Sequence, residues 1–553
     1  MLNQKRLAIA LLSGCLFTFS SGLTVAEPNI DPAQLDFEAY GNGLETGTTS
    51  VPTAVEGYAP WAPLVQKSFL SVNFDDNGEE NEGFRFIPPD PIGAAGLSRV
   101  ISVVNTMIES RNKGGAMKWR TSLANFFAPL EPETFTFDPK IVYDQYEDRF
   151  IVVTLERVIG GSDTSNPDNK SRILLAVSKN GNPQTATAAD WHYMAIDAKI
   201  TNIFGLNLDL WADYPGFEVD EDAIYITANY FVFPGGPFGG LFGSSFVWIV
   251  DKSGLYDGDT SAASVYDPGI ESGVYFGLTY MPAQVFGEGG IGGPGSTIGT
   301  YLVGYSGLTF GGIGASEAAQ VIAIDDPLGK VGGPLFSSEF VVFGDIETVG
   351  GACGYAALAD APQAGGDALI EVNDRRALDA VWRDNSLWMV MTIDPDGECG
   401  NTLAGTTKAY WSKMDASGGP GTITQADGGT IDGVDITSDA TTFFPAVAVN
   451  RNGVAKFGFS ASGPDIYAGA FVTGTDPSYP VGMVGPTETI KAGEDYYLRT
   501  FGGPRNRWGD YSGISVDPSN ESKFWIFNMY AAPQGTDIGG EFGRWGTAWG
   551  RTN

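Results

Sequence analysis

Acidic, amide, arginine and aromatic residues recur at the ends of a strand pair that the sequence repeats seven times. One set directly precedes the first strand of a pair: Asp90, Asp138, Asp213 with Tyr214, Arg375 with Arg376, Phe444, and Trp508 with Asp510 and Tyr511. A second set ends the second strand: Asn105, Glu156, Asn229, Tyr305, Thr392, Ser460 and Asn528. If the pairs stand around one axis, both sets meet at one opening, which is the predicted site.

Two kinds of chemistry fit these residue types. Two carboxyl groups at the opening, for example Asp138 and Glu156, form an acid and base pair for glycosidic cleavage if they lie roughly 5 to 10 Å apart. The structural alternative is that each Asp caps its own turn by accepting hydrogen bonds from backbone amides. A ring of polar groups can also hold water or a cation.

Histidine chemistry is disfavoured because His192 is the only histidine. A catalytic zinc site usually uses two or three histidines, and a Ser-His-Asp triad needs one beside the nucleophile. His192 lies in WHYMAI, which we expect to be an outer strand far from the opening.

The elements that must position these residues are the repeated pairs. The segment 137–155, FDPKIVYDQYEDRFIVVTL, predicts two antiparallel strands joined by a polar turn at 144–148. Units aligned on its proline start at Pro91, Pro139, Pro215, Pro282, Ala377, Pro445 and Ser512. Further strand pairs follow, such as RILLAVSKNG and DWHYMAIDA, which makes four strands a unit.

Seven units of four strands predict an all-β protein, a seven-bladed β-propeller of four-stranded antiparallel blades. The 75 glycines and 32 prolines among 553 residues are typical of short strands with many turns. The last unit supplies only three strands, so we expect FLSVNF at 69–74 to add the fourth and close the ring.

A resemblance rests on PPDPIGAAG (88–96), FDPKIVYDQYEDRFIVV, WADYPGFEVDEDAIYITANYF (211–231), FFPAVAVNRNGVAKFGFS (443–460) and RWGDYSGISVDPSNESKFWIFNMY (507–530). The chain resembles secreted bacterial propeller proteins that are similar to sialidase-like propellers, from about Phe69 onward. It departs from that group at Asn528-Met529-Tyr530, where Asn-Glu-Tyr is frequent. The chain also lacks the turn pattern S-x-D-x-G-x-x-W, so sialidase activity itself is disfavoured.

The N-terminus predicts export. Residues 1–26 read as a signal peptide, with Lys5 and Arg6 before an apolar stretch and Ala26 at a cleavable position. Lipid attachment at Cys15, in Leu-Ser-Gly-Cys, is the less favoured alternative. We expect residues 27–66 to form an extended arm and 67–553 the propeller, in a secreted, periplasmic or cell-surface protein without a transmembrane segment.

Charge and cysteine content limit the partners. A net charge of −34 disfavours nucleic acid and anionic membranes, which are bound through clustered Lys and Arg. Cys353 and Cys399 predict a disulfide rather than a zinc site. No cofactor is expected except calcium, which Asp75, Asn77 and Glu79 could hold, with a solvated acidic turn as the alternative.

The sequence therefore predicts a monomeric binding protein whose ligand is a glycan, a cation or an extracellular protein. The ligand site is the axial mouth or a loop-rich face. The alternative is a carbohydrate-active enzyme, a glycoside hydrolase or lyase, that uses the carboxyl groups of the mouth.

Overall fold

The hairpin at 137–155 folds as two antiparallel strands, β6 (Thr136–Asp144) and β7 (Arg149–Val158). In the turn, the Tyr146 amide donates to Asp144 Oδ1 at 2.9 Å, and Asp148 has a φ of +52°. Aspartate suits both positions because its short carboxylate binds nearby amides and it tolerates the left-handed region. The predicted hairpin is confirmed.

The computed structural model describes residues 65–553 except 202–207, 275–278, 288–289, 294, 308, 311–315, 348–355 and 399. The predicted signal peptide, nearly all of the predicted arm, Cys15, Cys353 and Cys399 lie outside the described residues.

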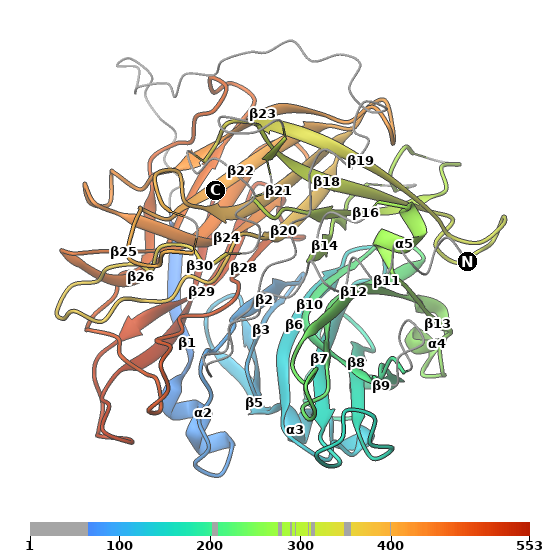
Figure 1. Ribbon diagram of the computed structural model, residues 1–553, viewed down its shortest axis with the longest axis horizontal. Helices are drawn as coiled ribbons and strands as arrows, with labels where there is room; N and C mark the ends of the chain where they lie inside the picture. Colours follow the sequence, from blue (N-terminus) through green and yellow to red (C-terminus); the bar gives the residue numbers. More distant parts are fainter. Residues whose placement is uncertain are drawn as a thin grey trace.

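Seven sheets surround a common axis, which confirms the seven-bladed propeller. In sheet order the strands are β2 (Ile92–Ala95), β3 (Arg99–Val104), β4 (Met107–Asn112), β5 (Met117–Ser122); β6, β7, β8 (Lys170–Ser178), β9 (Trp191–Asp197); β10 (Leu210–Val219), β11 (Ala223–Val232), β12 (Phe242–Asp251), β13 (Ala263–Tyr266); β14 (Tyr280–Pro282), β16 (Ile298–Gly304), β18 (Ser316–Asp325), β17 (Thr309–Phe310), β19 (Leu335–Gly344); β15 (Gln284–Val285), β20 (Ala377–Arg383), β21 (Ser386–Ile393), β22 (Lys408–Asp415), β23 (Thr424–Ile431); β24 (Thr441–Val449), β25 (Ala455–Gly463), β26 (Ile466–Thr475), β27 (Glu488–Lys491); and β28 (Gly513–Val516), β29 (Phe524–Ala532), β30 (Arg544–Thr552), β1 (Lys67–Asn73). The labels of the innermost strands surround the centre of Figure 1.

Two blades differ from the expected four strands. Both β17 and β19 pair with β18 in the fourth sheet, and β15 adds to the fifth sheet in parallel beside β20. The segment that leaves β14 thus crosses to the next blade before it returns as β16. Sequence periodicity did not predict this exchange because β15 and β17 have only two residues each.

Apolar side chains fill the space between neighbouring sheets. Val153 of β7 and Ile226 of β11, for example, are fully buried in one cluster that joins the second and third blades. Both faces of these sheets are covered, so their strands read as nearly continuous apolar runs rather than as an alternating pattern. This packing holds the innermost strands rigidly around the axis.

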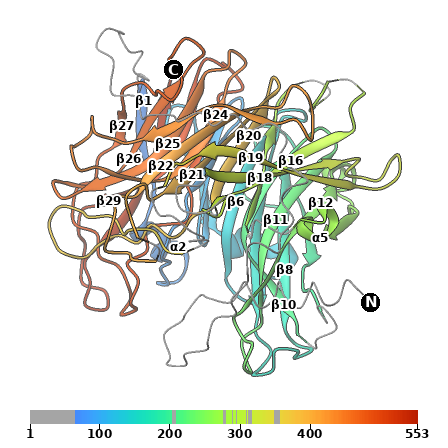
Figure 2. The same ribbon diagram turned by 45° about the horizontal axis from the view of Figure 1, so that its top comes forward.

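The ring closes where the N-terminal strand joins the C-terminal blade. β1 pairs antiparallel with β30, which confirms the closure predicted from FLSVNF. Figure 2 shows the blue β1 among the orange and red strands of the last blades. Because β1 occupies the outer edge of this sheet, β30 presents no unpaired backbone groups there.

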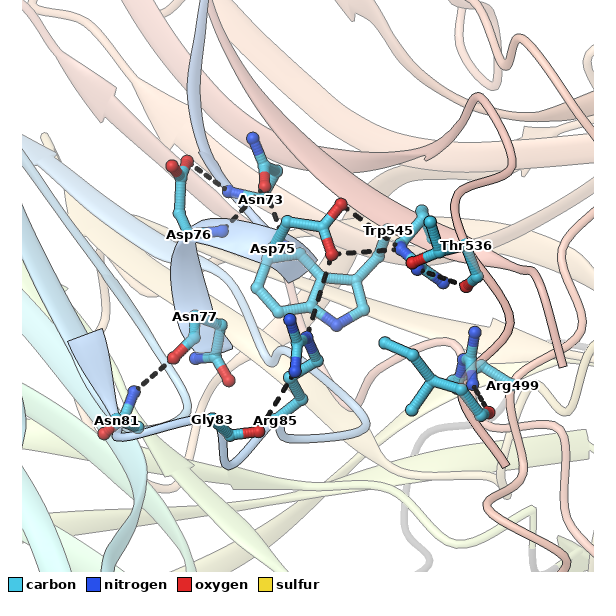
Figure 3. A network of polar contacts seen from close by, with 12 residues as sticks. Asn73, Asp75, Asp76, Asn77, Asn81, Gly83, Arg85, Arg499, Thr536 and Trp545 are labelled. Atoms are coloured by element: carbon cyan, nitrogen blue, oxygen red, sulfur yellow. Dashed lines mark hydrogen bonds and ion pairs between the residues drawn. The ribbon is translucent and has the colours of Figure 1, made fainter. Parts of the chain in front are cut away.

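A short helix, α2 (Phe74–Glu80), follows β1 and contacts the end of the chain (Figure 3). The Asn73 side chain caps the helix by accepting from the Asp75 and Asp76 amides, and the Asp76 carboxylate accepts from the Asn73 amide. Asp75 pairs with Arg85 at 3.7 Å and with Arg544 at 3.2 Å. The ion pair between Asp75 and Arg544 is thus a second link, besides the pairing of β1 with β30, between the N-terminal segment and the last blade.

The other helices are short: α3 (Leu123–Phe126), the 3-10 turn η2 (Ala128–Leu130), α4 (Lys252–Asp257) and α5 (Pro268–Ser272). Within the described ranges, none of the helices has the length and hydropathy to span a membrane.

Candidate functional site

The strand entrances at the axial mouth share an unusual backbone conformation. Asp90, Asp138, Tyr214 and Phe444 each precede the proline of an innermost strand, with φ between +47° and +51°. Three of the pairs also shift register at this point, as β-bulges do. A non-glycine residue in the left-handed region costs roughly 1 to 3 kcal/mol, so the surrounding contacts must hold it there.

Those contacts link four neighbouring blades. Asn105 Nδ2 donates to Asp90 Oδ2 at 2.6 Å, and its Oδ1 accepts from the Asp138 amide at 2.8 Å. The Tyr214 amide donates to Asp138 Oδ2 at 3.1 Å, and the Asp510 amide donates to Asp90 Oδ1 at 2.9 Å. The aspartates therefore bind the strand entrance of an adjacent blade and not their own turn. Five of the predicted site residues meet in this way.

Two arginines complete the cluster from the C-terminal half of the chain. Arg507 Nη2 donates to the two Asp510 oxygens at 2.6 and 2.5 Å. Arg376 binds Asp374 through Nε and Nη2, both at 2.5 Å, and its guanidinium lies 4.3 Å from the centre of the Tyr214 ring. Arg376 was among the predicted residues; Arg507 was not, although it stands three residues before Asp510 in the same motif.

Burial dominates the electrostatics of the mouth. Burial, and then the nearby Asp510, raises the pKa of Asp90 to about 8. The pKa of Asp138 is raised well above its usual value by burial and then by Asp213 and Asp90. The pKa of Asp213 is raised by burial and Asp510. Burial acts on Asp510 too, but Arg507 and its hydrogen bonds outweigh it and lower that pKa. Asp90 thus holds a proton near neutral pH.

Glu156 is not part of this cluster. Its Oε1 accepts from the amides of Glu133 and Thr134 at 2.5 and 2.9 Å, and its Oε2 accepts from Arg172 Nε at 2.5 Å. The residue is 1% exposed. Glu156 therefore anchors the loop before β6. The carboxyl groups that act on Asp138 are those of Asp213, Asp90 and Asp510.

Four further predicted residues make contacts inside or between blades. Asn229 Nδ2 donates to Thr279 Oγ1 at 2.9 Å, and Arg375 Nε donates to Glu347 at 2.5 Å. Trp508 Nε1 and Asn528 Nδ2 both donate to Ser460 Oγ, at 3.0 and 3.2 Å. Tyr511 stays at the axis, where its ring packs against Tyr214 with centroids 5.4 Å apart.

The half-buried rim of the mouth holds three residues of the second and third blades. The Arg157 guanidinium lies 3.9 Å from the centre of the Trp211 ring, and Asp213 stands two residues after Trp211. Asp213 acts on the pKa of Arg157, yet within the described part of the chain Arg157 forms no ion pair. Sequence reasoning missed Arg157 and Trp211, although each stands next to or near a predicted residue.

A row of aromatic rings, here called the aromatic band, extends from this rim. It consists of Phe84, Phe86, Phe135, Phe137, Trp211, Phe231 and Phe242. Successive centroids lie 5.2 to 6.2 Å apart. Phe84 and Phe135 are 56% and 51% exposed, and the other five rings are partly exposed. Such a surface is unusual for a face that binds nothing.

The segment considered for calcium folds as α2. Asp75 pairs with arginines, Asn77 is buried and donates to the Asn105 carbonyl at 2.9 Å, and Glu79 lies 3.8 Å from Arg120. Among the described residues, no group of three or more His, Cys, Asp or Glu side chains is placed to hold a metal ion.

Comparisons with known proteins concern the fold. No protein-family model and no curated protein matches the sequence. Among solved structures, Trypanosoma rangeli sialidase matches 83% of this chain and 57% of its own, with 8% identity and a TM-score of 0.33. A Hadza microbial sialidase matches 83% of this chain and 74% of its own, with 11% identity and a TM-score of 0.33. A glycosyl hydrolase from Bacteroides ovatus matches 64% of this chain and 87% of its own, with 11% identity and a TM-score of 0.27.

The chain is therefore distantly similar in structure to sialidase-type propellers. It spans little more than half the length of the trypanosomal sialidase chains that it matches. The propeller assignment itself rests on the seven sheets and their closure.

Proposed function

We propose that the protein binds a carbohydrate at the rim of the mouth and along the aromatic band. The observation that carries this proposal is the group formed by Arg157, Trp211 and Asp213. The Arg157 guanidinium lies over the Trp211 ring, and the Asp213 carboxyl group acts on it electrostatically, so this rim offers hydrogen-bond donors and acceptors together. Neighbouring hydroxyl groups of a sugar require this arrangement, and the exposed Phe135 ring offers an apolar surface to its C–H face.

The ligand is expected to be uncharged. The net charge of −34 repels polyanions over the whole surface. Burial raises the pKa of Asp90 and of Asp138 beneath the rim, which favours their uncharged forms, so they add hydrogen-bonding groups with little charge. A neutral polysaccharide or oligosaccharide fits both conditions better than an acidic one.

A glycan array with the purified protein, followed by calorimetry with a selected oligosaccharide, tests the proposal. Arg157→Ala and Phe135→Ala should each weaken affinity at least about tenfold, which corresponds to about 1.4 kcal/mol. Matched controls are Arg451→Ala and Phe542→Ala, which change exposed residues that belong to neither the rim nor the band. Absence of binding to any glycan, or equal affinity in all four variants, would contradict the proposal.

A second candidate is glycoside hydrolysis at the same mouth. Asp90 and Asp510 are joined by the 2.9 Å amide contact, and their pKa values are pushed in opposite directions. Such a split is typical of an acid and its partner in catalysis. However, the two residues are only 1% and 5% exposed, which leaves little access for a substrate. Binding is therefore the better supported function.

Mass spectrometry of the selected glycan after long incubation separates the two candidates. Binding predicts that the glycan is recovered intact. Recovery of fragments, together with their loss in Asp510→Asn, would instead establish the hydrolase.

A further inference from the structure

A second polar site lies deeper in the axial channel. A cavity of about 430 Å³ is lined by residues of the innermost strands β2, β6, β10, β14, β15, β20 and β28. Along these strands the mouth residues come first and the lining follows: Asp138 precedes Lys140, and Tyr214 precedes Glu218. The paired rings of Tyr214 and Tyr511 lie between the acidic cluster and the cavity, since Lys140 Nζ is 4.0 Å from the centre of the Tyr511 ring. The volume is in the range of small-molecule sites.

The charged residues that line this cavity include Lys140, Glu218 and Asp379, which come from three blades. Lys140 is only 7% exposed, and within the described residues its ammonium forms no hydrogen bond or ion pair. Asp379 and Glu218 are nevertheless the two carboxyl groups that influence its pKa most, after burial. Lys140 thus faces these two carboxyl groups without forming an ion pair with either.

The carboxyl groups are also incompletely paired. Asp379 Oδ1 and Oδ2 accept from the amides of Ala380 and Val447, both at 2.9 Å, which fixes its position. Glu218 Oε2 is enclosed and, in the described chain, has no hydrogen-bond partner. Enclosed polar groups without partners are costly, so they mark places where a ligand supplies the missing contacts.

We propose that this cavity binds a small zwitterion of the free amino acid class. Its carboxylate pairs with Lys140, and its ammonium group lies between Glu218 and Asp379. The wall also presents the apolar side chains of Ile92, Met281, Phe286, Leu378 and Val516, which suit an apolar side chain of the ligand. An amine or a carboxylate alone leaves one of the buried charges unmatched.

Proton release follows from this arrangement. Burial, and then Asp379, raises the pKa of Glu218 well above its usual value, which favours the protonated form of Glu218 in the free protein. Burial raises the pKa of Asp379 to about 6 and lowers that of Lys140. The other titratable side chains of the cavity wall are Tyr143, Tyr146, Asp148, Arg383 and Glu521, of which the last two pair with each other at 2.5 Å. An ammonium beside Glu218 favours its ionised form, so affinity should rise with pH.

Calorimetry of the full chain with L-leucine tests the proposal, with isoamylamine and 4-methylvalerate as probes that carry only one of the two charges. Leucine should bind at least about tenfold more tightly than either probe, and Glu218→Gln and Lys140→Met should each lose at least about tenfold in affinity. In two buffers of different ionisation enthalpy, the wild type should release a proton on binding and Glu218→Gln should not.

Lys456→Met is the matched control, because Lys456 is equally buried but lines a different cavity. Thermal melts confirm that each variant folds, and a leucine-induced rise in melting temperature provides a second readout. No leucine binding at millimolar concentration, isoamylamine binding as tightly as leucine, or wild-type affinity in both Lys140→Met and Glu218→Gln would overturn the proposal.

Discussion

At the scale of single residues, the neighbours of a carboxyl group decide its role. Asp138 and Asp510 both stand at strand entrances, yet Asp138 lies among other carboxyl groups while Asp510 lies against Arg507. The first pKa rises and the second falls, although both residues are buried. Spacing in the sequence places such residues at one mouth but does not assign their protonation.

The raised pKa of Asp138 predicts a pH dependence of stability. Asp90, Asp213, Asp510 and Arg507 are the charged groups that act on it. Because its folded pKa exceeds the unfolded value near 4, the native state holds an extra proton, and stability falls as the pH rises above about 4. Relative to Asp138→Asn, which mimics the protonated form, the wild type should lose stability as the pH rises above about 4, with a slope of at most about 1.4 kcal/mol per pH unit. Urea unfolding at several pH values measures the free energy of unfolding of both proteins. If it changed with pH equally in the wild type and in Asp138→Asn, the prediction would be contradicted.

Glu156→Gln separates structure from binding at the mouth. The side-chain amide that replaces the carboxylate must place its N–H donor either against Arg172 or against the backbone amides of Glu133 and Thr134, which are donors themselves. We expect a loss of about 2 kcal/mol in the free energy of unfolding with unchanged affinity for the array-selected glycan. Wild-type stability with lost affinity would show that Glu156 contacts the ligand.

The sequence predicted the location of the site better than its members. The positions of Asp90, Asp138 and Asp510 followed from the repeated spacing. Glu156 and Arg375 do not join the cluster at the mouth. The direction of a side chain at a strand end depends on the local bulge and on loop contacts, which the spacing of residues does not encode. Arg157 and Trp211 were missed because they lie outside the repeated positions.

At the scale of elements, the strand pairs were predictable because apolar runs and turn residues agree in each unit. The acidic segment after β1 was harder, since DDNGEENE was interpreted as a calcium loop or, alternatively, as a solvated acidic turn. The capping box on Asn73 and the arginines of distant segments make it a helix. Contacts across more than 400 residues cannot be read from local composition.

Asn73→Ala should weaken this closure. The substitution leaves the amides of Asp75 and Asp76 without their acceptor, which typically costs about 1 kcal/mol. Urea unfolding measures the loss, with Asn452→Ala in an exposed turn as the control. Equal stability of the two variants would mean that the cap contributes nothing to ring closure.

At the scale of the whole molecule, one strand from the start of the chain completes the last blade. Val72 of β1 is 1% exposed, while Leu70 on the same strand is 53% exposed. The two side chains differ because the register of β1 against β30 shifts between Leu70 and Asn73. Val72→Asp places an unpaired charge in the core and should cost more than about 3 kcal/mol, whereas Leu70→Asp should cost little.

Limited proteolysis and thermal melts check this pair of variants. Val72→Asp should expose the last blade, 513–552, to the first cuts and lower the melting temperature. If Val72→Asp resisted protease as well as Leu70→Asp, ring closure would not limit the stability of the propeller.

Carbohydrate binding at the mouth face is tested most directly by hydrogen exchange with and without an array-selected oligosaccharide. The ligand should slow amide exchange in segments 131–138 and 209–214, which carry Phe135, Phe137, Trp211 and Asp213, and leave 450–456 on the opposite end of the sixth blade unchanged. Protection confined to other segments would contradict the account.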